Sequence, residues 1–163
     1  MPKRSGTTLR RFYRELKRIE EEKVQLLEKI PRLLEKRFGK ATVILIGSRA
    51  RGTHNSGSDI DLVVITPAFG GKVLEERISL FKKTLETRLF IDLHPYTPEE
   101  ALERASEDPF ILDAVVEGRT LLDTLNIIPK LTEKVARTKL RKTKVGWLRK
   151  INAPKTSLNE MSV

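Results

Sequence analysis

Two aspartates separated by a single residue are the side chains in this sequence best placed to do chemistry. Asp59 and Asp61 belong to the segment SDIDLVV, residues 58–64, whose apolar residues predict a β-strand. Alternate side chains of a strand point to the same face, so the two carboxylates would project together, roughly 7 Å apart along the backbone. Like charges placed in this way repel each other, whereas Mg²⁺ is commonly held by one or two carboxylates together with substrate phosphates. The pair therefore indicates a metal site; the alternative is an acidic strand end exposed to solvent.

A glycine–serine corner precedes the aspartates. Gly47 and Ser48 follow VILI, residues 43–46, an apolar run typical of a buried strand. Glycine lets the backbone approach a ligand closely, and successive N–H groups at such a turn form a concavity that binds anions. The Ser48 hydroxyl adds a donor, and Arg49 and Arg51 add positive charge. Phosphate donors beside paired carboxylates suit a metal-bound nucleoside triphosphate, although an ordinary tight turn is the alternative for the corner taken alone.

The corner and the aspartates together resemble a known signature. GSRARG, residues 47–52, is followed by SDIDL, residues 58–62, with ten residues between Ser48 and Asp59. This pattern resembles that of the minimal nucleotidyltransferases of the DNA polymerase β superfamily. The resemblance covers residues 42–64 plainly and extends more loosely to Asp123. It implies a third carboxylate on a later, adjacent strand.

Asp92 is the candidate for that third carboxylate. It lies in LFIDLH, residues 89–94, which reads as a short strand with Asp92 on one face beside Phe90 and His94. The resemblance implies that the three aspartates are both catalytic and metal-binding, and that a second group of residues binds the nucleotide. The catalytic and metal set is Asp59, Asp61 and Asp92, and the nucleotide set is Gly47, Ser48, Arg51 and Ser58. The alternative for Asp92 is a carboxylate at a strand end before Pro95.

The resemblance also implies a reaction. A nucleoside monophosphate would pass from an NTP, with ATP as the expected donor, to an acceptor hydroxyl, and pyrophosphate would leave. Two Mg²⁺ ions, or Mn²⁺ in their place, would be held by the aspartates. Arg51 would offset the developing negative charge or support the loop. His54 could contact the nucleotide, and His94 could orient the attacking group or ligate a metal. Both rank below the aspartates, because a loop or strand-end histidine needs no role in the chemistry.

Composition bounds the compartment and the partners. The chain has 163 residues, no cysteine and a net charge of +10, so disulfides, cysteine-ligated zinc and thiol nucleophiles are excluded. No signal peptide or long apolar span is visible, and we expect a cytoplasmic protein without a membrane partner. Residues 1–40 and 124–163 are basic, whereas residues 41–123 are acidic. These basic flanks would suit a nucleic-acid acceptor or docking onto an acidic protein.

The order of the predicted strands and helices indicates an α/β fold of the α+β kind, in which a small mixed β-sheet is flanked by helices. The resemblance implies a nucleotidyltransferase (polymerase β palm-like) core. Residues 1–40 form an N-terminal amphipathic helical segment, residues 41–123 the core, and residues 124–163 a basic C-terminal helix and tail. Strands are predicted at 43–46, 58–64, 88–93 and 119–123, and helices at 8–29, 32–38, 72–86, 97–106, 109–116 and 130–150. Pro31 is expected to kink or restart the first helix.

The acceptor stays open at this stage. RNA, a small molecule and a protein hydroxyl are all acceptors in the superfamily, and antitoxin-like members pair with a helical partner protein. The alternative to an enzyme is a non-catalytic module that binds nucleic acid or a partner on the same fold. Intact carboxylates at all three positions argue against that alternative.

Overall fold

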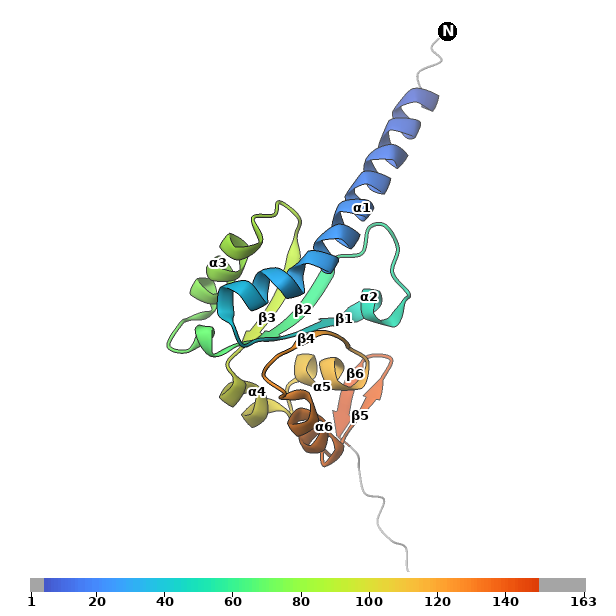
Figure 1. Cartoon of the computed structure of the whole chain (residues 1–163). Helices are drawn as coiled ribbons and strands as arrows, with labels where there is room; N and C mark the ends of the chain where they lie inside the picture. Colours follow the sequence, from blue (N-terminus) through green and yellow to red (C-terminus); the bar gives the residue numbers. More distant parts are fainter. Residues whose placement is uncertain (1–4, 150–163) are drawn as a thin grey trace, which may run out of the picture.

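The computed structural model describes residues 5–149, which alternate between helices and strands (Figure 1). In chain order the elements are α1 (Ser5–Phe38), β1 (Thr42–Ile46), α2 (Gly47–Arg51), β2 (Ile60–Ile65), η1 (Pro67–Phe69), α3 (Leu74–Leu85), β3 (Ile91–Tyr96), α4 (Pro98–Arg104), α5 (Pro109–Val116), β4 (Arg119–Asp123), α6 (Ile128–Ala136), β5 (Leu140–Thr143) and β6 (Gly146–Arg149). Within residues 5–149 no helix combines the length and the apolar character needed to cross a membrane.

Four strands form one mixed sheet in the order β3-β2-β1-β4. β1 runs antiparallel to both β2 and β4, whereas β2 and β3 are parallel. Parallel neighbours need a crossover connection, which η1 and α3 supply here. The predicted mixed sheet flanked by helices is confirmed.

Helices cover both faces of the sheet (Figure 1). One face packs against α1 and α3, and its buried residues include Leu34, Leu62 and Phe81. The other face packs against α4, α5 and α6, and its buried residues include Ile44, Val63 and Leu131. Alternate strand residues point to the same face, so Asp61, two residues before Val63, lies on the face that packs against α5.

Two strands differ from their predicted bounds. β2 begins at Ile60, so Asp59 lies one residue before the strand rather than within it. β3 covers Ile91–Tyr96 instead of residues 88–93 and continues through Pro95. Proline cannot donate to a ladder, but β3 is an edge strand, where proline is tolerated.

The first helix is longer than predicted. α1 runs from Ser5 to Phe38 as one helix, so of the two expected effects of Pro31, a kink or a restart, the restart does not occur. Ile30 and Leu34, on either side of Pro31, are fully buried against the sheet, which holds the two parts together. The N-terminal part of α1 extends away from the rest of the molecule (Figure 1).

The prediction of one basic helix over residues 130–150 is wrong. α6 ends at Ala136, and the chain then forms an antiparallel hairpin from β5 and β6; Lys150 lies outside the described residues. Threonine, valine and glycine occur at positions 143, 145 and 146, and all three have low helix propensity. The helix–hairpin unit docks on α5, because Lys142 and Trp147 both contact Asp113.

Candidate active site

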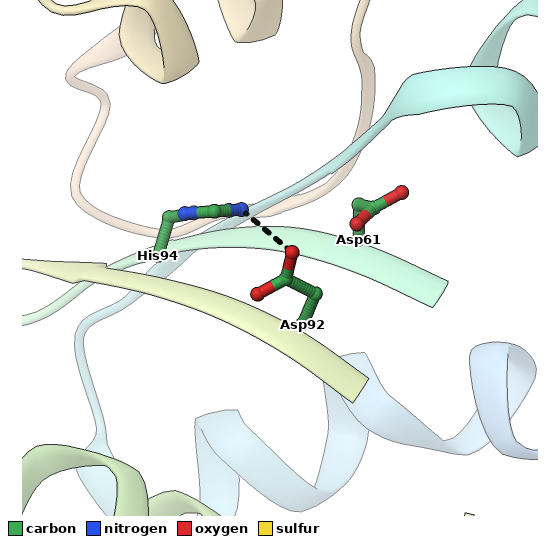
Figure 2. Close-up of side chains that lie close together, drawn as sticks. All are labelled: Asp61, Asp92 and His94. Carbon is green, nitrogen blue, oxygen red and sulfur yellow. Dashed lines mark ion pairs between the residues drawn. The ribbon is translucent and has the colours of Figure 1, made fainter. Parts of the chain in front are cut away.

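Asp61 and Asp92 meet at the sheet surface that faces α5. They are direct partners in the parallel ladder of β2 and β3, so their side chains point to the same face (Figure 2). One ligand atom from each, together with one from His94, lies within 4.8 Å of the others. Two carboxylates and one imidazole at this spacing match the donors that divalent cations such as Mg²⁺ and Mn²⁺ accept. The residues present therefore fit a metal ion.

Burial and neighbouring carboxylates raise the pKa of Asp61 at this surface. Burial raises the pKa of the Asp61 carboxyl first, and the negative charges of Asp92 and Asp59 raise it further. The positive charge of Arg51 opposes this rise in pKa. Without a cation, ionised carboxylates at this place destabilise one another, which is the electrostatic signature expected of a metal site.

His94 is held beside Asp92. Its Nε2 lies 3.7 Å from Asp92 Oδ2 (Figure 2). Its ring stacks on that of Phe110 at a centroid distance of 3.6 Å. Burial lowers the pKa of the imidazole despite the nearby carboxylates of Asp92 and Asp108. A neutral imidazole is the form that binds a metal. From the sequence, His94 was expected to share the face of Asp92 and was ranked below the aspartates as a metal ligand.

Asp59 lies at the rim of the site. It is exposed, and it precedes β2 by one residue. Its charge reaches Asp61 closely enough to raise the pKa of that residue. Within residues 5–149, however, the group of ligand atoms around Asp61 and Asp92 includes His94 and not Asp59.

Gly47 brings the backbone of the corner against Asp61. Its φ of +75° lies in the left-handed region, and a Cβ added there would be 2.6 Å from Asp61 Oδ2. No residue with a side chain fits this position without a shift of one of the two groups. Within residues 5–149 the Ser48 hydroxyl has no hydrogen-bond partner. The corner therefore leaves backbone and hydroxyl donors next to the carboxylates.

The loop between the corner and Asp59 is anchored to α1. Three hydrogen bonds converge on the Ser58 carbonyl oxygen, from Lys23 Nζ at 2.9 Å and from Arg49 Nε and Nη2 at 3.2 and 2.9 Å. Arg49 also makes a bidentate contact with Glu20 at 2.9 and 2.7 Å, and its side chain is 3% exposed. Arg49 and the Ser58 carbonyl thus fix the loop that ends at Asp59.

His54 lies in the same loop, farther from the carboxylates. Its Nε2 is 3.6 Å from Glu20 Oε1, and its side chain is partly exposed. The position on the loop agrees with the sequence, and the contact ties the loop to α1. His54 is absent from the Asp61–Asp92–His94 group.

The family model of the nucleotidyltransferase domain matches residues 27–122, which include the corner, β2 and β3. No curated protein matches the chain.

Several solved structures resemble the chain. A candidate nucleotidyltransferase from Sulfolobus solfataricus is 18% identical with a TM-score of 0.48, and the match covers 68% of this chain and 89% of that one. A toxin–antitoxin structure with AMP-PNP is 22% identical with a TM-score of 0.47, covering 68% and 83%. The toxin–antitoxin MntA–HepT is 21% identical with a TM-score of 0.42, covering 69% and 83%.

Proposed function

Because the chain belongs to the nucleotidyltransferase domain family, we propose that it transfers a nucleoside monophosphate from an NTP, with ATP as the expected donor, to an acceptor hydroxyl. The acceptor oxygen forms a bond to the α-phosphorus, the bond from that phosphorus to the bridging oxygen breaks, and pyrophosphate leaves with the electron pair. The acceptor proton passes to solvent. The observation that carries the proposal is the convergence of Asp61 and Asp92 beside the Gly47 corner.

Asp59, Asp61 and Asp92 are the residues that we expect to hold Mg²⁺, as two ions, or Mn²⁺ in their place. The pairing of Asp61 with Asp92 in the sheet supports this expectation for those two residues. The effect of Asp59 on the pKa of Asp61 supports it for Asp59. When bound, such ions neutralise phosphate charge and make an acceptor hydroxyl more acidic. His94 orients Asp92 through their contact.

The corner and the loop bind the nucleotide in this proposal. Backbone N–H groups at Gly47 and Ser48, together with the Ser48 hydroxyl, donate to the triphosphate. Arg51 supplies positive charge near Asp61, as its effect on the pKa of that carboxyl indicates. Ser58 contributes by holding the loop in place, since its carbonyl accepts three hydrogen bonds and its side chain interacts with Asn55.

Transfer from α-labelled ATP tests the proposal. The wild-type chain with Mg²⁺ should transfer label to an acceptor and release pyrophosphate, and EDTA should stop both. Asp61→Asn should lower the rate by at least about 100-fold, since it removes a charge that would hold the cation at the reacting phosphate. Glu103→Gln, an exposed carboxylate on α4, is the matched control and should leave the rate unchanged. A rate for Asp61→Asn close to that of wild type would reject the proposal.

A second candidate function is that of a partner-binding module without turnover. The specific observation is an apolar stripe on the projecting part of α1, where Leu9, Phe12 and Tyr13 are 55%, 56% and 62% exposed. Exposed apolar surface of this kind marks sites of protein interaction, and a helical partner would suit it. The two candidates are separated by one comparison. Label transfer that survives Phe12→Ser favours the enzyme, whereas a chain that never transfers label but binds a partner through Phe12 favours the module.

A further inference from the structure

A cavity of about 630 Å³ opens between α2, the end of α5 and the β5–β6 hairpin. Its lining contains three basic side chains and one acidic side chain: Arg51, Lys142, Lys144 and Glu117. The hairpin lies beyond residue 122, where the match to the family model ends. The cavity is therefore built in part by a segment outside the match to the family model.

The hairpin is fixed in place by α5. Asp113 contacts Lys142 Nζ and accepts a hydrogen bond from the Trp147 indole Nε1 at 2.9 Å. The ammonium group of Lys142 also lies 5.5 Å from the centroid of the Trp147 ring. These contacts hold the turn of the hairpin, which carries Lys144, over the end of α5.

The charges inside the cavity do not cancel. Glu117 contacts Arg51 at 3.4 Å and Lys142 at 4.0 Å, and Lys142 also pairs with Asp113, so two carboxylates are set against the three cations. Lys144 is exposed, and within residues 5–149 it has no ion-pair or hydrogen-bond partner. An excess of positive charge around one hollow favours an anionic ligand.

The cavity is next to the candidate active site. Arg51 lies at the end of α2, whose first residue is Gly47, and four residues of helix span roughly 6 Å. Arg51 also lines the cavity, so α2 joins the Gly47 corner to the cavity. An anion held in the cavity would therefore lie about one helical turn from the corner that touches Asp61.

We propose that this cavity binds a backbone phosphate of a nucleic-acid acceptor and so directs its terminal hydroxyl toward Asp61 and Asp92. This inference rests on the proposed function. Arg51, Lys142 and Lys144 line one hollow, and three cations placed in this way suit a phosphodiester. Phe110, 41% exposed and stacked on His94, adds an aromatic edge that a base can contact. An acidic peptide would use the charges but would have no comparable use for the ring.

Binding and transfer by the full chain test the proposal together. A fluorescein-labelled single-stranded oligoribonucleotide and the matching oligodeoxyribonucleotide, each with a free 3′ hydroxyl, are titrated with protein at several salt concentrations. Lys144→Gln should weaken binding about five- to tenfold and lower the slope of log affinity against log salt by about 0.7. Lys82→Gln, the same change on α3 at the opposite face of the sheet, is the control and should change neither quantity. Label from α-labelled ATP should appear on the oligonucleotide, and Lys144→Gln should reduce that transfer.

Three results would overturn this inference. Equal affinity of wild type and Lys144→Gln for both oligonucleotides would exclude the cavity as a phosphate site. Label on a protein acceptor instead of the oligonucleotides would assign the basic surface to a protein. Mg²⁺–ATP should raise the melting temperature of Lys144→Gln as much as that of wild type, and a smaller rise would assign the cavity to the donor triphosphate. A wild type that transfers no label defeats the proposed function separately, because the binding titration still decides the cavity.

Discussion

Replacing Gly47 by alanine is the most informative single change, because it separates backbone strain from damage to the site. Gly47 has a φ of +75°, and left-handed backbone costs a residue with a side chain roughly 1–2 kcal/mol. The added Cβ would also lie 2.6 Å from Asp61 Oδ2, whereas ordinary contact begins at 3.4 Å. The carboxylate and the corner must therefore move apart by about 0.8 Å, the difference between these two distances.

Backbone strain should appear in the melting temperature, and the displacement of Asp61 should appear in the transfer rate. In a chain of this size, 1–2 kcal/mol lowers the melting temperature by about 2–8 °C. A misplacement near 1 Å at a reacting centre costs about 100-fold in rate, which corresponds to about 2.7 kcal/mol of activation free energy. We therefore expect Gly47→Ala to fold and to lose most of its nucleotidyl transfer.

Gly39→Ala is the matched control. Gly39 has a φ of +72° with no atom within 4 Å of the added Cβ, so it carries the backbone strain without the contact to Asp61. Melting temperatures by circular dichroism should fall by similar amounts in the two variants. Initial rates of label transfer at saturating Mg²⁺ and ATP should fall about 100-fold in Gly47→Ala alone. Equal rates in the two variants would refute the claim that the corner and Asp61 act as one site.

Three further predictions concern charge. In EDTA at pH 7, Asp61→Asn should melt at a higher temperature than wild type, because the raised pKa of Asp61 makes its ionised form unfavourable in the folded state. The protonated carboxyl contributes stability below the unfolded-state pKa, and that stability is lost as pH rises through the higher folded-state pKa. The difference in melting temperature should therefore vanish near pH 3, and a lower melting temperature of Asp61→Asn at pH 7 would contradict this. Glu100→Gln should lower the free energy of unfolding at pH 7 by about 1–3 kcal/mol in urea titrations, because the hydrogen bonds from Arg77 hold the Glu100 pKa at about 2. That stability is present above the unfolded-state pKa of 4.5 and is lost as pH falls through about 2. A loss equal to that of the exposed Glu99→Gln would count against this prediction. Arg49→Met should speed hydrogen exchange of residues 53–59 by tenfold or more and lower transfer, because the Ser58 carbonyl loses two of its three donors, whereas unchanged exchange would show that Arg49 does not anchor the loop.

The convergence of Asp61 and Asp92 was largely predictable from local pattern. The Asp-x-Asp segment, the glycine–serine corner and the strand at Asp92 each have a period or a turn signal that the sequence displays, and parallel pairing then puts Asp61 opposite Asp92. The strand bounds were less predictable. β3 continues through Pro95 because it is an edge strand, and edge position depends on the order of strands rather than on the segment itself.

The anchoring of the loop could not be predicted in the same way. Lys23 and Glu20 look like one polar stretch of a helix, yet they contact residues 35 and 29 positions later in the chain. The hairpin after α6 was missed for a similar reason. Its basic residues match a helical face as well as a strand, and its contact to α5 is made with Asp113, 29 residues before Lys142. Pairings over such separations come from the fold.

Locating bound manganese tests the central claim most directly. Crystals of the full chain grown with Mn²⁺ and a non-hydrolysable ATP analogue would be measured at a wavelength where manganese scatters anomalously. We expect an anomalous peak within about 2–3 Å of carboxylate oxygens of Asp61 and Asp92, with the triphosphate next to Gly47 and Ser48. A nucleotide bound elsewhere, or manganese that contacts neither carboxylate, would contradict it.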